Sequence, residues 1–186
     1  MKKLMLGSGL LSLFAFAALA SSALAPANFA GTWKLDKEKS KGLSQGMQNA
    51  ESVVWTITQD DKQITIDSKV TQGQPPAGAQ AGGPGGGGGR GGGMGGPRTY
   101  TLDGKEVTSE AGGQAGGTNT MKSSWANDGK TLELSSVRAG NFNGTEFKST
   151  STDKMSLSAD GKVLTDERHS ESPRGSQDST LVFNKQ

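Results

Sequence analysis

Two residue types in this chain have the spacing of a catalytic nucleophile and its base. Residues 42–46 read G-L-S-Q-G, which fits the G-x-S-x-G motif of a nucleophilic serine, and the single histidine, His169, follows downstream. Between them lie three aspartates, Asp153, Asp160 and Asp166. The motif needs a sharp turn from a parallel strand into a helix, and no strand-helix-strand repeat surrounds Ser44. We therefore interpret the match as coincidence and predict no catalytic residues.

Metal and cofactor sites also find little support in the sequence. The chain has one histidine and no cysteine, which removes most transition-metal sites and all thiol nucleophiles. D-G-K triplets beginning at Asp103, Asp128 and Asp160 offer too few oxygen ligands for calcium. We interpret them as hairpin turns, in which glycine takes the positive φ of a tight turn. The sequence predicts no metal, no cofactor and no enzymatic activity.

His169 and Arg168 are two charged side chains that the strand pattern singles out. His169 is expected on the exposed face of its strand, with a pH-dependent or haem-ligand role as the alternative. Arg168 shares the inward parity of Asp166. It is expected at the solvated rim, because charged side chains are rarely buried unpaired; a buried pair with Asp166 or a contact to an anionic head group are the alternatives. Arg138 is a second candidate for such a contact, although Val137 suggests a bulge there.

Apolar and polar residues alternate with period two over most of the chain, which predicts strands. Over residues 51–59, Val53, Trp55 and Ile57 alternate with polar neighbours. The same alternation recurs in the segments 64–70, 100–107, 121–125, 132–134, 147–157, 164–170 and 181–183. Short turns separate these segments, and helix is expected only within residues 37–48. The sequence therefore predicts an all-β fold, an antiparallel up-and-down β-barrel of 8–10 strands.

The first of these strands carries a recognisable motif. Residues 28–35 read N-F-A-G-T-W-K-L. This G-x-W strand resembles the first strand of the lipocalins and fatty-acid-binding proteins, the calycin superfamily. The chain as a whole resembles exported lipocalin-like proteins of bacteria. The resemblance implies a barrel in which Gly31 lets the strand bend closely at the bottom and Trp33 plugs that end.

Small polar residues occupy many of the inward positions of the predicted barrel. They are Asn119, Ser123, Ser136, Ser149 and Ser151. A dry core would leave their hydroxyl and amide groups unsatisfied, so we expect a partly hydrated cavity. The predicted function is binding of a small, mostly apolar ligand. The predicted ligand-binding residues are Trp55, Tyr100, Met121, Trp125 and Arg168. One alternative is a structural or protein-binding barrel, such as an inhibitor or envelope-associated module, with a filled interior. A cyclase-like or isomerase-like enzyme in a barrel is the other.

The amino-terminal 25 residues have the pattern of a signal peptide. Lys2 and Lys3 precede an uncharged apolar run from Leu4 to Ala20, and small residues suit cleavage after Ala20, Ala25 or Ala27. An uncleaved membrane anchor is the alternative. We expect export to the periplasm or the medium, with no stable membrane insertion after cleavage. Residues 28–186 are then expected to form a single domain.

Residues 73–97 interrupt that domain with 14 glycines in 25 residues. Such a segment buries almost nothing to offset the entropy of ordering it, so we predict a flexible, disordered loop. An RGG-type nucleic-acid segment around Arg90 is the alternative, but it has one arginine and no aromatic neighbour. Without Lys2 and Lys3 the chain has 18 basic and 18 acidic residues. This balance argues against nucleic acid as a partner.

Overall fold

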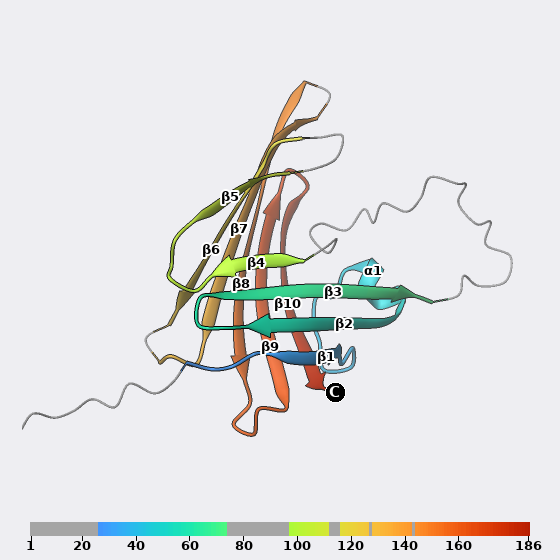
Figure 1. Ribbon diagram of the computed structural model, residues 1–186. Helices are drawn as coiled ribbons and strands as arrows, with labels where there is room; N and C mark the ends of the chain where they lie inside the picture. The colour runs from blue at the N-terminus through green and yellow to red at the C-terminus, as the bar shows by residue number, and fades with distance from the viewer. Residues whose placement is uncertain (1–25, 74–96, 112–115, 127, 143) are drawn as a thin grey trace, which may run out of the picture.

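The computed structural model describes residues 26–73, 97–111, 116–126, 128–142 and 144–186. The predicted signal peptide and nearly all of the predicted glycine-rich loop lie outside these residues. Within the described part of the chain, ten antiparallel strands form one sheet that curls into a nearly closed barrel (Figure 1). This confirms the predicted all-β, up-and-down barrel of 8–10 strands.

The strands follow one another around the wall in chain order, apart from one seam. Their bounds are β1 (Gly31–Leu35), β2 (Ala50–Gln59), β3 (Gln63–Gln72), β4 (Arg98–Thr101), β5 (Val107–Glu110), β6 (Thr118–Trp125), β7 (Leu132–Phe142), β8 (Thr145–Leu157), β9 (Val163–Ser172) and β10 (Gly175–Lys185). β1 pairs with both β2 and β10, which joins the two ends of the chain. The seam lies between β4 and β5, which are not paired with each other. Across it, the hydroxyl of Ser123 in β6 donates to the carbonyl of Thr101 in β4 at 2.6 Å. A short helix, α1 (Gln45–Asn49), precedes β2 in the segment where helix was expected.

The D-G-K triplets form turns, as the sequence predicts. Asp103, Asp128 and Asp160 each accept a hydrogen bond from the backbone N–H two residues later, at 2.8 to 3.1 Å. Gly104, Gly129 and Gly161 have φ of 76°, 64° and 68°. The side chain of Lys105, and next its backbone N–H, lower the pKa of Asp103 to about 2. The aspartate therefore stabilises the turn whose positive φ the glycine permits.

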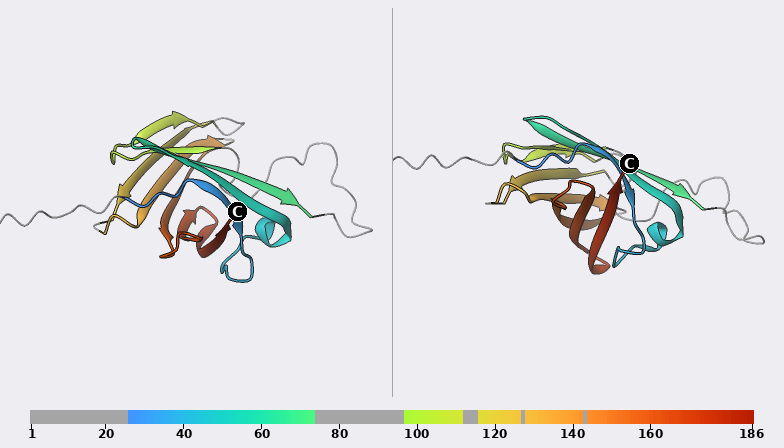
Figure 2. Two further views of the ribbon diagram at one scale, coloured as in Figure 1. Left: turned by 60° about the horizontal axis from the view of Figure 1, so that its bottom comes forward. Right: turned by 90° about the horizontal axis from the view of Figure 1, so that it is seen from below.

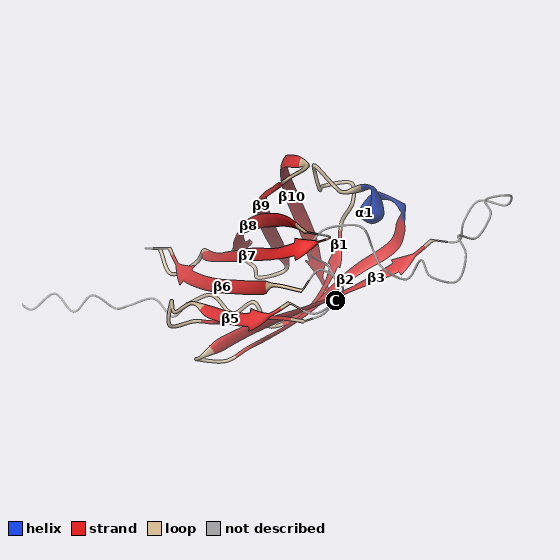
Figure 3. Cartoon of the chain, turned by 90° about the horizontal axis from the view of Figure 1, so that it is seen from above, coloured by secondary structure: helices blue, strands red, loops and turns tan. Residues whose placement is uncertain are grey.

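Two layers of strands pack against each other around the apolar core. β1–β4 cross one end of the longer strands β7–β10, as two further views make clear (Figure 2). The core between the layers includes Trp33, Trp55, Ile64, Ile66, Leu132, Leu134, Met155, Leu164, Leu181 and Phe183, all almost fully buried. We call β1–β4 the cover sheet. The buried apolar residues of the long strands lie toward the ends that it crosses, and the inward-facing residues toward their other ends are partly or fully exposed. Figure 3 shows the same strands from above.

The G-x-W strand lies at the covered end of the barrel. Trp33 is completely buried, and its indole Nε1 donates to the Phe29 carbonyl at 2.8 Å. Gly31 has φ of 142°, and a Cβ there would lie 3.0 Å from Cε of Lys185. The ammonium group of Lys185 lies 5.2 Å from the ring centroid of Trp33, at cation–π distance. Glycine at position 31 thus lets β1 and the end of β10 approach closely beside Trp33.

Beyond the cover sheet, one row of inward-facing residues crosses six neighbouring strands. Residues paired directly across a ladder share a face of the sheet. The paired residues of this row, from β5 to β10, are Val107, Met121, Ser136, Ser151, Ser170 and Gln177. All six are partly or fully exposed, in contrast to the core residues on the same face. We call this set the open row.

A close backbone contact gives a prediction on stability at Gly42. Gly42 has φ of 64°, and a Cβ there would lie 2.2 Å from the Asp178 carbonyl oxygen, whereas Gly161 has φ of 68° and open space around it. Gly161→Ala is expected to cost about 1–2 kcal/mol of unfolding free energy for the left-handed backbone alone. Gly42→Ala adds a backbone overlap and is expected to cost roughly 3 kcal/mol or more. Urea unfolding of both variants checks this; equal losses would contradict the close contact.

Candidate interior binding site

A cluster of charged side chains lies inside the barrel, where the cover sheet ends. β4 contributes Arg98 and Tyr100, β8 contributes Asp153, and β9 contributes Asp166 and Arg168. We call these five residues the interior cluster. They face inward because residues two apart on a strand share a face, and because Asp153 is paired directly with Arg168 in the β8–β9 ladder.

Arg168 is the centre of the interior cluster. Its Nε donates to Asp153 Oδ1, and its Nη2 donates to Asp166 Oδ2 at 3.1 Å. Nη1 of Arg98 lies 3.6 Å from the other oxygen of Asp153. The side chains of Asp153 and Asp166 are 2% and 0% exposed, against 14% for Arg168 and 20% for Arg98. The carboxylates are therefore sealed in, and the two guanidinium groups form the side nearer to solvent.

Burial shifts the titration of this cluster. Burial raises the pKa of the Asp166 carboxyl from 3.8 to about 7, against the opposing effect of Arg168. Burial acts to lower the pKa of Arg168, but Asp166 and Asp153 outweigh it and the pKa is raised. Both raised pKa values agree with one guanidinium shared between two carboxylates. The two carboxylates keep Arg168 charged, whereas Arg168 cannot fully compensate the burial of both carboxylates. Burial also raises the pKa of Tyr100, so its hydroxyl remains a donor.

Several buried polar atoms at this cluster have no hydrogen-bond partner within the described part of the chain. They are Trp55 Nε1, Tyr100 Oη, Asp153 Oδ2 and Asp166 Oδ1, with Ser68 Oγ nearby. Ser68 pairs directly with Trp55 in the β2–β3 ladder, so it faces the same interior. A buried polar group left without a partner costs about 1–3 kcal/mol. The cluster therefore has unused donors and acceptors that a bound polar molecule would satisfy.

The structure brings together three of the five predicted ligand-binding residues. Trp55, Tyr100 and Arg168 meet inside the barrel, with Cζ of Arg168 lying 5.8 Å from the Trp55 ring centroid. Met121 lies in the open row, on the same face and beyond the cluster. Trp125 lies apart from them, because its ring stacks on Phe29 at 6.1 Å between centroids.

Arg168 is not at the solvated rim, so that expectation was wrong. Its two ion pairs show the alternative, a buried pair with Asp166, extended by Asp153. The sequence analysis missed Arg98 as a member of the cluster and considered Asp153 only as a catalytic candidate. Position 98 is two residues before Tyr100 and so shares its face, which was the available signal.

The predicted bulge near Val137 is absent from the β7–β8 ladder, which pairs in regular register from Leu132 to Phe142. Arg138 therefore pairs with Ser149 on the inward-facing side. Its side chain is exposed beyond the cover sheet, with Cζ 5.8 Å from the ring centroid of Phe147. Arg138 thus stands outside the interior cluster.

The small polar inward residues are divided by the end of the cover sheet. Ser123 is buried and satisfied by its bond to Thr101. Asn119, Ser136, Ser149 and Ser151 are partly exposed on the uncovered inner face. These four groups reach water on an open surface, which satisfies them without the partly hydrated cavity that the sequence predicted.

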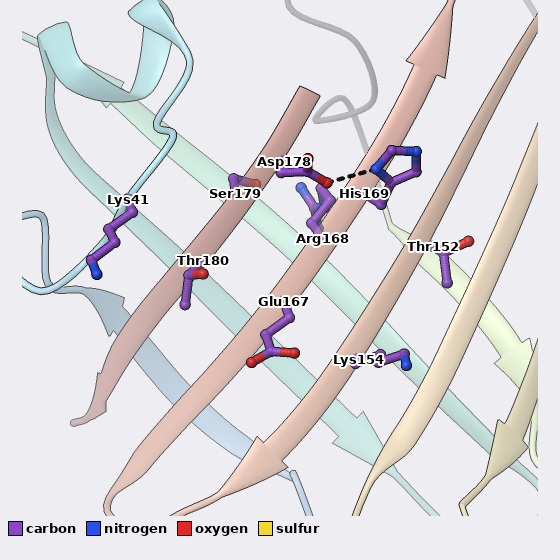
Figure 4. Close-up of a pocket in the computed structure, with 9 residues that line it drawn as sticks. All are labelled: Lys41, Thr152, Lys154, Glu167, Arg168, His169, Asp178, Ser179 and Thr180. Carbon is purple, nitrogen blue, oxygen red and sulfur yellow. Dashed lines mark hydrogen bonds and ion pairs between the residues drawn. The ribbon is translucent and has the colours of Figure 1, made fainter. Parts of the chain in front are cut away.

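His169 lies on the outside of the barrel, as expected. A hollow of about 450 Å³ on the outer face of β8–β10 is lined by Lys41, Thr152, Lys154, Glu167, Arg168, His169, Asp178, Ser179 and Thr180 (Figure 4). His169 Nδ1 lies 2.6 Å from Asp178 Oδ1, and Nε2 lies 3.4 Å from Glu171 Oε1. The contact to Asp178, and to a smaller extent that to Glu171, raises the pKa of the exposed imidazole. The outer hollow is open and its lining mixes both charges, whereas the carboxylates of the interior cluster are buried.

The serine motif does not form a catalytic arrangement with His169. Ser44 precedes α1 with extended backbone, and the hydrogen-bond partners of His169 are Asp178 and Glu171. All ladders of the described sheet are antiparallel, so the parallel strand that a nucleophile turn needs is missing there.

Over the described ranges, His, Asp and Glu side chains form no group of three or more that could hold a metal ion. In those ranges no helix is both long and apolar enough to cross a membrane.

No family model and no curated protein sequence matches this chain. Among solved structures, it is similar to the zebrafish ileal bile acid-binding protein complexed with cholic acid. The identity is 13% and the TM-score 0.47, over 85% of this chain and 98% of that one.

Proposed function

We propose that this chain is an exported, non-enzymatic, lipocalin-like barrel that binds one small, mostly apolar ligand. The ligand's polar group lies at the interior cluster, and its body extends along the open row. The observation that carries this proposal is the group of unpartnered buried atoms around Arg168, at the point where the inner face becomes uncovered. The export part rests on the predicted signal peptide.

The interior cluster lies next to the open row. Ser151 and Ser170 lie two residues along their strands from Asp153 and Arg168, on the same face. The two arginines are the cluster's most exposed side chains. A ligand lying along the row would therefore meet the guanidinium edge first, and its polar group would displace water there.

The open row also supplies apolar surface at one end. Val107 and Met121 are paired directly across β5 and β6. Among the described residues, Val107 is the large apolar side chain that is exposed, at 36%. Serines and Gln177 occupy the rest of the row. The proposed apolar body therefore lies at the β5–β6 end, next to the seam.

A paired substitution tests this placement. Met121→Lys puts a charge on the open row, whereas Thr120→Lys puts the same charge on the outer face of the same strand. We expect the uncharged probe N-phenyl-1-naphthylamine to bind the natural protein with one site per chain. Met121→Lys should weaken that binding about tenfold or more, since a desolvated ammonium opposes an apolar contact. Thr120→Lys should leave it within about twofold.

Fluorescence titration measures both effects, with circular dichroism as the check that each variant is folded. Equal losses in the two variants would place the probe elsewhere. If neither this probe nor a broad panel of lipids binds, the proposal fails and the protein-binding barrel becomes the better interpretation.

A further inference from the structure

The charges of the interior cluster already compensate one another. Two guanidinium groups, Arg98 and Arg168, face two carboxyl groups, Asp153 and Asp166, and each arginine contacts at least one of them. Arg168 places two of its nitrogens on carboxylate oxygens inside the protein. An arginine that is engaged in this way offers little free charge to an incoming anion.

The buried atoms of the cluster that lack a hydrogen-bond partner include both donors and acceptors. Trp55 Nε1 can only donate and the Tyr100 O–H can donate, whereas Asp153 Oδ2, with Arg98 Nη1 3.6 Å away, and Asp166 Oδ1 accept when ionised. A carboxylate ligand would satisfy the donors but approach two carboxylate oxygens of like charge. An ammonium ligand would satisfy the acceptors but leave the indole and phenol without partners. Only a group that both donates and accepts satisfies the two kinds together.

We propose that the polar group held at the interior cluster is uncharged and carries both a donor and an acceptor, as a carboxamide or an alcohol does, because the unpartnered buried atoms around the paired Arg168 are two donors and two acceptors. This inference rests on the proposed ligand-binding function and names the ligand's head group. It replaces the anionic head group that an inward arginine suggested from sequence.

Four ten-carbon compounds with one tail and different head groups test the inference. They are decanamide, 1-decanol, decanoic acid and decylamine, each titrated against the full folded chain below its micelle concentration. The titration is done at pH 8, above the Asp166 pKa of about 7, so that the Asp166 carboxyl is largely ionised. Displacement of N-phenyl-1-naphthylamine gives the four dissociation constants. Decanamide and 1-decanol are expected to bind about tenfold or more tightly than the acid and the amine.

Tyr100→Phe tests whether the ligand's head group contacts the Tyr100 hydroxyl in the interior cluster. The variant removes a hydroxyl that has no hydrogen-bond partner among the described residues, so the fold should be retained and the unfolding free energy unchanged or slightly raised. Decanamide binding should weaken about fivefold or more, with little change for decylamine. Thr99→Val is the matched control, since it removes the neighbouring hydroxyl, which bonds Thr65 Oγ1 at 2.9 Å. It should leave all four dissociation constants within about twofold.

The outcomes separate the two proposals. Tightest binding by decanoic acid, or equal binding of all four compounds, overturns the inference and leaves the binding function standing. Unchanged decanamide affinity in Tyr100→Phe also overturns it. Failure of every compound to displace the naphthylamine probe, or of the probe itself to bind, overturns the binding function and the inference together.

Discussion

An Arg168→Met variant is expected to lose about 3–5 kcal/mol of unfolding free energy, because it leaves buried carboxyl groups without their compensating charge. Asp153 and Asp166 both bond Arg168 and are almost completely buried. Urea unfolding at pH 8 measures the loss. Arg138→Met is the matched control: that guanidinium is exposed beside Phe147, so its removal should cost about 1 kcal/mol or less.

A multiple variant shows that the loss comes from uncompensated charge. Combining Arg168→Met with Asp153→Asn and Asp166→Asn removes both buried carboxylates together with Arg168 and leaves only Arg98 charged, whose side chain is 20% exposed. Replacing buried ion pairs together is often neutral or nearly so. We expect the triple variant to recover most of the stability that Arg168→Met loses. A loss below about 1 kcal/mol in the single variant would mean that water already compensates the two carboxyls.

Stability is also expected to fall as pH rises from about 4 to about 7, because of Asp166. Burial raises the pKa of its carboxyl from 3.8 to about 7, so between these values the folded protein binds a proton that the unfolded chain has released. The contribution is complete below the unfolded pKa and is lost as pH rises through the folded one. A shift of this size corresponds to up to roughly 4 kcal/mol.

Asp166→Asn isolates this effect, since the amide keeps the shape and does not titrate. The natural protein's free energy of unfolding, measured by urea at half-unit steps of pH, should decline over this window, and the variant should decline much less. His169 requires such a control, because its raised pKa gives a loss in the same direction. Parallel profiles for the two proteins would show that Asp166 titrates as an ordinary exposed carboxyl.

Local patterns in the sequence predicted most of the fold. Alternation located the strands, and the D-G-K triplets located three turns, because both signals depend on residues a few positions apart. The same parity placed Trp55 and Arg168 inside the barrel. The predicted bulge at Val137 failed because the β7–β8 ladder keeps regular register through that residue.

The composition of the site depended on contacts that no local pattern contains. Arg98 meets Asp153 only because the cover sheet crosses the long strands at that level. The rim was the expected place for Arg168 because its second partner, Asp153, was not identified. Likewise, Ser136 and Ser151 face inward as predicted, yet the length of the cover sheet leaves them open to water. Sequence parity gives the face of a strand, and tertiary packing decides whether that face is covered.

The strand order also bears on the path of folding. From β5 to β10 every pair is a hairpin between neighbours in the chain, so this half can form through short loops. The pairing of β1 with β10 instead joins opposite ends of the chain, Trp33 with Lys185 among them. Bringing β1 and β10 together costs the conformational entropy of the long chain between them before their contacts form, and such non-local pairings slow folding. Assembly of the interior cluster needs β4 and β9 from both halves, so the site becomes complete only when the cover sheet docks.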